Sequence, residues 1–104
     1  MSARVMELEE KLKPILAALN IGNLQEIIED YLFTEILSRI SKFKEEISFF
    51  EKKYQKNFEE LKQEYESQPE DFEVYEDLMA WEFALEGYNY WSKKLQELKE
   101  CFTN

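Results

Sequence analysis

SQPED, residues 67–71, is the stretch that decides the direction of this chain. Pro69 interrupts helical hydrogen bonding, and its ring pushes Gln68 towards an extended conformation. Long apolar repeats with helical spacing lie on both sides, so one helix must end here and another must begin. The carboxylate of Asp71 can cap the second helix by accepting bonds from its first backbone N–H groups. We therefore predict that the chain reverses at residues 67–71.

The segment after the turn predicts a helix over residues 72–101. Its apolar residues recur at intervals of three and four, which places them on one face of a helix. This face comprises Val74, Leu78, Trp81, Leu85, Tyr88, Trp91, Leu95, Leu98 and Phe102. We expect it to pack against the helix that precedes the turn.

The segment before the turn predicts one helix over residues 24–67, because no helix breaker interrupts it. A coiled-coil-like seam alternates by four and three through Ile36, Ile40, Phe43, Ile47, Phe50 and Tyr54. The spacing then slips, because Phe58 lies eleven residues after Ile47, which is the signature of a stutter in a left-handed supercoil. At about 1.5 Å per residue, this helix would be roughly 66 Å long.

A shorter helix is predicted over residues 3–19. Its shared apolar face consists of Val5, Leu8, Leu12, Ile15 and Leu19. Pro14 would either kink this helix or begin a second short one. Asn23 followed by Glu26 predicts a capping box for the next helix, and Gly22 offers a flexible exit from the first.

Together these segments predict an all-α fold, a long antiparallel helical hairpin with a short N-terminal helix, in a single domain over residues 1–104. Two glycines and two prolines also disfavour a sheet with many tight turns. A compact monomer of about 100 residues has a radius of gyration of about 13 Å, which is small for so long a helix. Either the helix breaks, near Thr34, or the hairpin associates. We favour a homodimer that forms a bundle.

Several function classes are excluded by residues that the chain lacks. With no histidine and only Cys101, it has no ligand set for zinc or a helical di-iron centre, and no base for a catalytic thiolate. Gly22 and Gly87 are too far apart for a glycine-rich phosphate loop. We expect no cofactor, no metal and no enzymatic activity. One alternative is a carboxylate Mg²⁺ site, formed by Glu26, Glu29 and Asp30 or by Glu73, Glu76 and Asp77.

The start of the sequence, MSARVMELEE, carries acidic side chains where a secretory signal would have an apolar run. No window of about 18 apolar residues occurs anywhere. The single cysteine cannot form an intramolecular disulfide. We therefore expect a cytoplasmic protein with no membrane contact.

The helix after the turn has more apolar surface than one seam can use. In EDLMAWEFALEGYNYW, residues 76–91, Met79, Phe83 and Tyr90 form a second row that is displaced around the helix axis. This row could pack in a homodimer or on the N-terminal helix. It could also dock another protein, since Trp, Tyr and Met are common interface anchors. In either case Gly87 indicates a close approach to the backbone.

Negative charge is concentrated beside this row. Residues 59–86 carry eleven acidic residues against one base, Lys62, a net charge of −10 that equals that of the whole chain. Residues 38–58 carry six bases against three acids, a net charge of +3. Many acidic runs are only solvated faces. Here, eleven carboxylates around one turn oppose folding by repulsion, and acid beside aromatic side chains suits a basic protein partner.

The basic proteins of the cytosol are most commonly those that bind nucleic acid, because their own sites hold phosphates. The chain itself has only a short window of positive charge and no basic stripe. We therefore expect no direct binding of nucleic acid by this chain.

The stretch EDFEVYEDLMAWEFALEGYNYWSKKLQEL resembles the acidic, tryptophan-bearing helix of small helical prokaryotic antitoxin-like proteins, which are encoded beside ribonuclease or nucleotidyltransferase-type toxins. The resemblance covers roughly the last third of the chain. It is carried by Glu76, Asp77, Leu78, Trp81, Glu82, Tyr90 and Trp91. The first two thirds lack the DNA-binding module that many antitoxins have. What the resemblance implies is inhibition of a basic toxin by covering its active site.

We expect a non-enzymatic protein-binding module that inhibits or escorts a basic, nucleic-acid-acting protein. The predicted partner-binding residues are Glu73, Glu76, Asp77, Met79, Trp81, Glu82, Phe83, Glu86, Tyr90 and Trp91. The alternative is a structural or secretion-associated coiled-coil hairpin that acts through its dimer seam.

Overall fold

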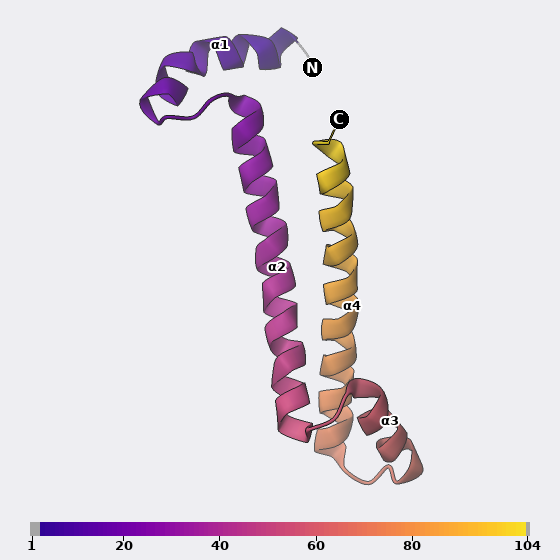
Figure 1. Ribbon diagram of the computed structural model, residues 1–104. Helices are drawn as coiled ribbons and strands as arrows, with labels where there is room; N and C mark the ends of the chain where they lie inside the picture. Colours follow the sequence, from indigo (N-terminus) through magenta and orange to yellow (C-terminus); the bar gives the residue numbers. More distant parts are fainter. Residues whose placement is uncertain (1–2, 104) are drawn as a thin grey trace. The chain divides into compact units, whose positions relative to one another are not determined.

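The computed structural model describes residues 3–103, which form helices and no strand over that range (Figure 1). The helices are α1 (Ala3–Ala18), α2 (Leu24–Tyr54), α3 (Phe58–Ser67) and α4 (Phe72–Cys101). The prediction of an all-α fold is confirmed. None of these helices, over the residues described, has an apolar stretch of the length that a membrane crossing needs. The chain divides into two compact units, Met1–Glu35 and Ile36–Asn104, and the number of domains stays a prediction.

The first unit contains α1 and the start of α2. α1 is one helix that includes Pro14, so the alternative of two short helices is wrong. It ends in a Schellman motif, in which Asn20 has a left-handed φ of 60° and the Ile21 N–H donates to the Leu16 carbonyl at 2.8 Å. Asn20, and not Gly22, therefore supplies the exit from this helix.

The capping box predicted at the start of α2 is present in an altered form. The Glu26 N–H donates to Asn23 Oδ1 at 2.8 Å, as an N-cap requires. The Glu26 carboxylate accepts a hydrogen bond from the Gly22 N–H at 2.9 Å, where a standard box would use the N–H of Asn23. This side chain therefore fixes the connection between α1 and α2.

The prediction of one helix over residues 24–67 is wrong, because the chain breaks at residues 55–57. Gln55 ends α2 in the left-handed region, with a φ of 53°. Asn57 then starts α3 with a complete capping box. Its side chain accepts from the Glu60 N–H at 2.9 Å, and the Glu60 carboxylate accepts from the Asn57 N–H at 3.1 Å. The slip in apolar spacing between Ile47 and Phe58 spans this break. A break near Thr34 is wrong, since α2 continues through that residue.

The predicted turn at residues 67–71 is confirmed. Asp71 caps α4 by accepting hydrogen bonds from the N–H groups of Glu73 and Val74, at 2.9 and 3.4 Å. Beyond this cap, α4 runs antiparallel to residues 36–54 of α2 (Figure 1). The hairpin is therefore present, and α3 is an extra helix at its closed end.

Trp81 is the centre of the core of the second unit, and only 1% of it is exposed. Its ring stacks on Phe50 of α2 and meets Phe58 of α3 edge-on, each at 5.6 Å between ring centroids. One side chain of α4 therefore joins three helices. Its indole N–H finds no acceptor among the residues that the structure describes, which costs about 1–3 kcal/mol. Burying the ring contributes more than this, since removing such a side chain typically costs about 3–5 kcal/mol.

Gly87 allows a phenylalanine of α2 to touch the backbone of α4. A Cβ atom built at this position would lie 2.5 Å from the ring of Phe43, well inside contact distance. The same ring meets Phe83 edge-on, at 5.8 Å between centroids. The close approach predicted at Gly87 is confirmed, and it comes from within the chain.

Candidate protein-docking surface

The second apolar row of α4 lies on the solvent side of the helix. Met79, Phe83 and Tyr90 are 54%, 64% and 54% exposed. Phe72, which is 70% exposed, lies seven residues before Met79 and extends this row towards the start of α4. Trp81 lies on the other side of the helix, in the core. α4 therefore has a second apolar face that its own unit leaves in water, and we call its four members the α4 row.

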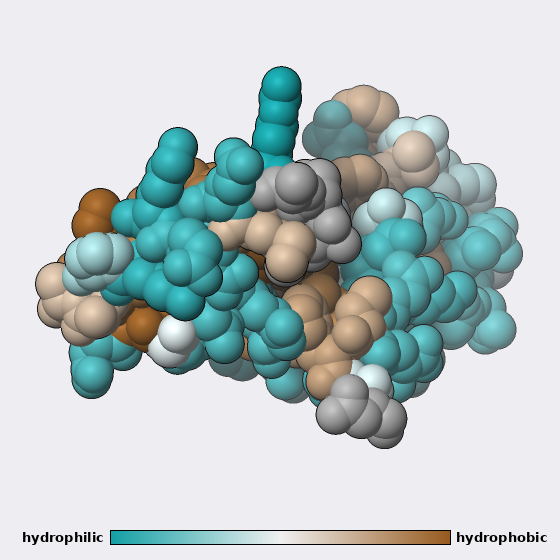
Figure 2. All heavy atoms as spheres, turned by 90° about the horizontal axis from the view of Figure 1, so that it is seen from above, coloured by the Kyte–Doolittle hydropathy of each residue, from teal (hydrophilic) through white to brown (hydrophobic). Residues whose placement is uncertain are grey.

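Three members of the α4 row, Phe72, Met79 and Phe83, line one wall of an open groove of about 1050 Å³ between α2 and α4. The wall on α2 consists of Lys42, Glu45, Glu46, Phe49 and Phe50, and that on α4 of Phe72, Tyr75, Glu76, Met79, Ala80 and Phe83. Because Phe50 is also a core residue, the floor of the groove is continuous with the core. In the space-filling view, apolar patches emerge between hydrophilic side chains (Figure 2).

The aromatic rings of the groove are held by their neighbours. Phe72 stacks on Tyr75, with centroids 6.1 Å apart. On the opposite wall, Phe49 meets Phe50 edge-on at 5.3 Å. These contacts restrict the rings before any partner arrives, which lowers the entropy that a partner would have to remove on binding.

The rim of the groove is predominantly acidic. Glu45, Glu46 and Glu76 face a single base, Lys42, among its lining residues. Residues 72–91 of α4 carry five acids and no base. Within the part of the chain that the structure describes, Glu45, Glu46 and Glu76 form no ion pair. Positive charge on a partner would therefore be favoured beside the groove.

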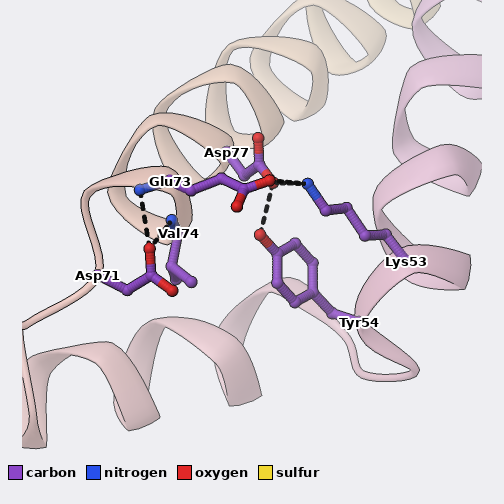
Figure 3. A network of polar contacts seen from close by, with 6 residues as sticks. All are labelled: Lys53, Tyr54, Asp71, Glu73, Val74 and Asp77. Carbon is purple, nitrogen blue, oxygen red and sulfur yellow. Dashed lines mark hydrogen bonds and ion pairs between the residues drawn. The ribbon is translucent and has the colours of Figure 1, made fainter.

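Two of the predicted partner-binding acids are engaged inside the second unit. Lys53 Nζ lies 2.6 Å from Asp77 Oδ2 and 2.9 Å from Glu73 Oε1. The Tyr54 O–H also donates to Asp77 Oδ2, at 2.5 Å (Figure 3). This network ties the last turn of α2 to the first turns of α4, so Glu73 and Asp77 serve the fold of the hairpin.

The same network shifts three pKa values. Desolvation, followed by the hydrogen bond to Asp77, raises the pKa of Tyr54 to about 12. Desolvation would also raise the pKa of Asp77, but the hydrogen bonds from Lys53 and Tyr54 outweigh it and leave that pKa lowered. Hydrogen bonds to Asp77 and Glu73 raise the pKa of Lys53. At neutral pH each group therefore keeps the protonation state that the network requires.

The structure separates the predicted partner-binding residues by location. Those that line the groove are Glu76, Met79 and Phe83. Those exposed on α4 outside it are Glu82, Glu86 and Tyr90. The prediction of Trp81 as a partner-binding residue is wrong, because Phe50 of α2 and Phe58 of α3 cover its ring and only 1% of it is exposed. Trp91 is half-buried beneath the Arg39 guanidinium, 5.1 Å from its ring centroid.

Phe72, Phe49, Glu45 and Glu46 line the groove but are not among the partner-binding residues predicted from the sequence. Phe72 could have been found, because its seven-residue spacing from Met79 places both on one helix face. Phe49 had no such signal, since its position beside the α4 row depends on how α2 is rotated against α4. The same holds for Glu45 and Glu46, which sequence spacing alone leaves as ordinary helix-surface acids.

What the surface offers chemically is apolar contact area and negative charge. Within residues 3–103, no group of three or more carboxylate or thiol side chains is placed to hold a metal ion, and Glu73 and Asp77 contact Lys53 instead.

Comparisons with protein families, with curated proteins and with solved structures return no match to this chain. The geometry and charge of the surface are therefore the basis for a proposed function.

Proposed function

We propose that this protein is a non-enzymatic, cytoplasmic protein-binding module whose partner is a basic protein. The observation that carries the proposal is the α4 row, an exposed apolar surface bordered by carboxylates on both walls of the groove. Exposed aromatic and methionine side chains in a concave site are typical interface anchors. The acidic rim favours positively charged partners and disfavours acidic ones.

The partner class in this proposal is a nucleic-acid-acting protein. Such a protein carries a basic site for phosphates, and an acidic surface can compete for that site. The resemblance of residues 70–98 to antitoxin-like helices agrees with a basic, nucleic-acid-acting partner. It adds the proposal that this partner is a toxin. On this proposal, binding covers the active site of the partner and inhibits it.

The proposal is tested by capture with a tagged full-length protein in extracts of the cells that make it. We expect the wild type to enrich a basic protein, more strongly at low salt than at high salt. A Met79→Ser/Phe83→Ser double variant removes two exposed anchors and should lose that protein. The matched control is Met6→Ser/Ile15→Ser, which changes two side chains of α1 that are 59% and 56% exposed and should keep it. Recovery of no basic protein at either salt concentration would contradict the proposal.

A second candidate is a structural hairpin that acts by self-association. It is favoured by apolar side chains that the first unit exposes on α2, namely Ile27, Ile28, Tyr31 and Leu32. Light scattering of the wild type and of an Ile28→Ser/Tyr31→Ser variant tests this role, and a dimer lost only in the variant supports it. Loss of a dimer in Met79→Ser/Phe83→Ser, with partner capture retained, would favour a structural role for the α4 row as well.

A further inference from the structure

The shape of the groove fits a helical occupant. Its α4 wall extends from Phe72 to Phe83, which is about 16 Å along the helix axis. Phe72, Tyr75, Met79 and Phe83 follow one another at intervals of three and four, so they present a ladder of apolar contacts along the groove. A third helix laid between two antiparallel helices can match such a ladder with its own apolar stripe. Both walls are helices, which offer no unpaired strand edge, so an extended peptide would gain no backbone hydrogen bonds here.

The charge of the groove selects against a second copy of α4 as the occupant. Two copies that met through the α4 row would bring together Glu76, Glu82 and Glu86 of each α4, and residues 72–91 contain no base to offset them. Glu73 and Asp77 are already paired with Lys53. Like charges placed across an interface are unfavourable. Glu45 and Glu46 on one wall and Glu76 on the other would instead meet basic side chains on both flanks of an inserted helix.

We infer that the groove between α2 and α4 binds an amphipathic α-helix of a partner protein, with an apolar stripe and with lysine or arginine along both flanks. This inference rests on the proposed function and specifies the element of the partner that is recognised. The apolar stripe packs on Phe49, Met79 and Phe83, and the flanking cations approach the acidic rim.

A designed peptide tests this inference directly. The basic peptide has about 18 residues, with leucines at helical intervals of three and four and lysines elsewhere, long enough to be helical when bound. One control keeps the leucines and replaces the lysines with glutamates. Another is the basic peptide with two central prolines, which cannot form the helix. Binding of each labelled peptide to the full-length protein is followed by fluorescence anisotropy.

We expect the basic helical peptide to bind at least about tenfold more tightly than either control. Phe49→Ser/Phe83→Ser should weaken its binding by about tenfold or more, because both side chains are anchors that are 59% and 64% exposed and lie outside the buried core. Circular dichroism verifies that the variant is folded. Equal binding of the proline peptide, or equal binding to this variant, would overturn the inference.

A charge reversal supplies a readout that a folding defect cannot imitate. Glu46→Lys/Glu76→Lys changes one exposed rim acid on each wall and should shift the preference from the lysine peptide towards the glutamate peptide. An unchanged preference would overturn the inference.

Light scattering tests a second copy of this chain as the occupant. A dimer in the wild type and a monomer in Phe49→Ser/Phe83→Ser would overturn the inference, because a second copy would then occupy the groove. If capture of a basic protein depends on Met79 and Phe83 while the peptide fails to bind, the proposed function stands and only the helical occupant is rejected.

Discussion

At the scale of single residues, Gly87 shows how one missing methyl group sets the distance between two helices. Gly87→Ala gains up to about 1 kcal/mol of helix propensity. It also forces a Cβ atom into the Phe43 ring, and overpacking of this kind costs about 1–3 kcal/mol. We expect a net loss of about 1 kcal/mol in the free energy of unfolding, measured by urea denaturation. Phe43→Leu in the same chain should restore part of it. The exposed control Asn89→Ala should be neutral or slightly stabilising, and a Gly87→Ala protein more stable than wild type would show that the ring has room to move.

The contact between Tyr54 and Asp77 predicts a change of stability at high pH. The folded pKa of Tyr54 is raised from 10.0 to about 12, so its contribution is fully present below pH 10 and is lost as the pH rises towards 12. We expect Tyr54→Phe to cost about 1–2 kcal/mol at pH 8, because a hydrogen bond to a charged acceptor is removed. The difference between wild type and variant should shrink from pH 10 to 12. The control is Tyr31→Phe, at a tyrosine that is 63% exposed, and a Tyr54→Phe difference that stays constant over this window would contradict the assignment.

The same network predicts the opposite dependence at low pH. The folded pKa of Asp77 is lowered, so its carboxylate stabilises the fold above the unfolded value of about 3.9, and this contribution is lost as the pH falls through the folded pKa. Asp77→Asn should therefore be less stable than wild type at pH 7 and should approach it in acid. Thermal unfolding from pH 7 down to pH 2 measures the gap between them. A gap that widened in acid would mean that Lys53 and Tyr54 do not favour the ionised form.

At the scale of helices, the start of α3 depends on the Asn57 cap. Asn57→Ala removes the acceptor for the Glu60 N–H, and loss of such a cap typically costs about 1 kcal/mol. We expect this loss in urea denaturation and a smaller α3 contribution to the helical circular dichroism. Gln63→Ala, at an exposed position of the same helix, is the matched control and should change stability by less than about 0.5 kcal/mol. Equal effects of the two substitutions would show that the cap contributes little.

The comparison of α3 with α4 shows which helix boundaries sequence can predict. The turn before α4 was predictable because Pro69 and Asp71 act locally, through backbone geometry and capping. The break before α3 cannot be predicted from helix breakers, because it contains neither proline nor glycine, and a non-glycine residue, Gln55, takes the left-handed conformation there. The Asn57-x-x-Glu60 capping pattern was the available signal. Packing of Phe58 on Trp81 offsets the conformational cost of the left-handed Gln55, and that contact cannot be predicted from the sequence.

The residues of the candidate site likewise divide into those that the sequence predicts and those that it does not. Met79 and Phe83 were predictable because helix periodicity alone places them away from the main seam. Trp81 belongs to the main seam, so periodicity predicts that it is buried. Its prediction as a partner-binding residue conflicts with that position. The α2 wall could not be predicted, since the placement of Phe49 in the same groove as Met79 is set by the rotation of one helix against another.

At the scale of the whole molecule, the surplus of negative charge opposes folding and is available to a partner. The net charge is −10, and eleven acids lie in residues 59–86, which we call the acidic window. Cross-helix pairs such as Lys53 with Asp77 neutralise only part of this charge. Exposed ion pairs contribute about 0–1 kcal/mol each, so repulsion among the remaining carboxylates should dominate the response to salt.

We therefore expect the melting temperature to rise as NaCl is increased from about 0.01 M to 0.3 M, because the Debye length falls from about 30 Å to less than 10 Å. Glu66→Gln/Glu70→Gln removes two exposed acids of the window and should raise the melting temperature at low salt by a few degrees while reducing its dependence on salt. Gln63→Ala leaves the charge unchanged and serves as the control. A melting temperature that fell with added salt would mean that the ion pairs outweigh the repulsion. The acidic window would then be balanced within the chain, and a basic partner would gain little from it.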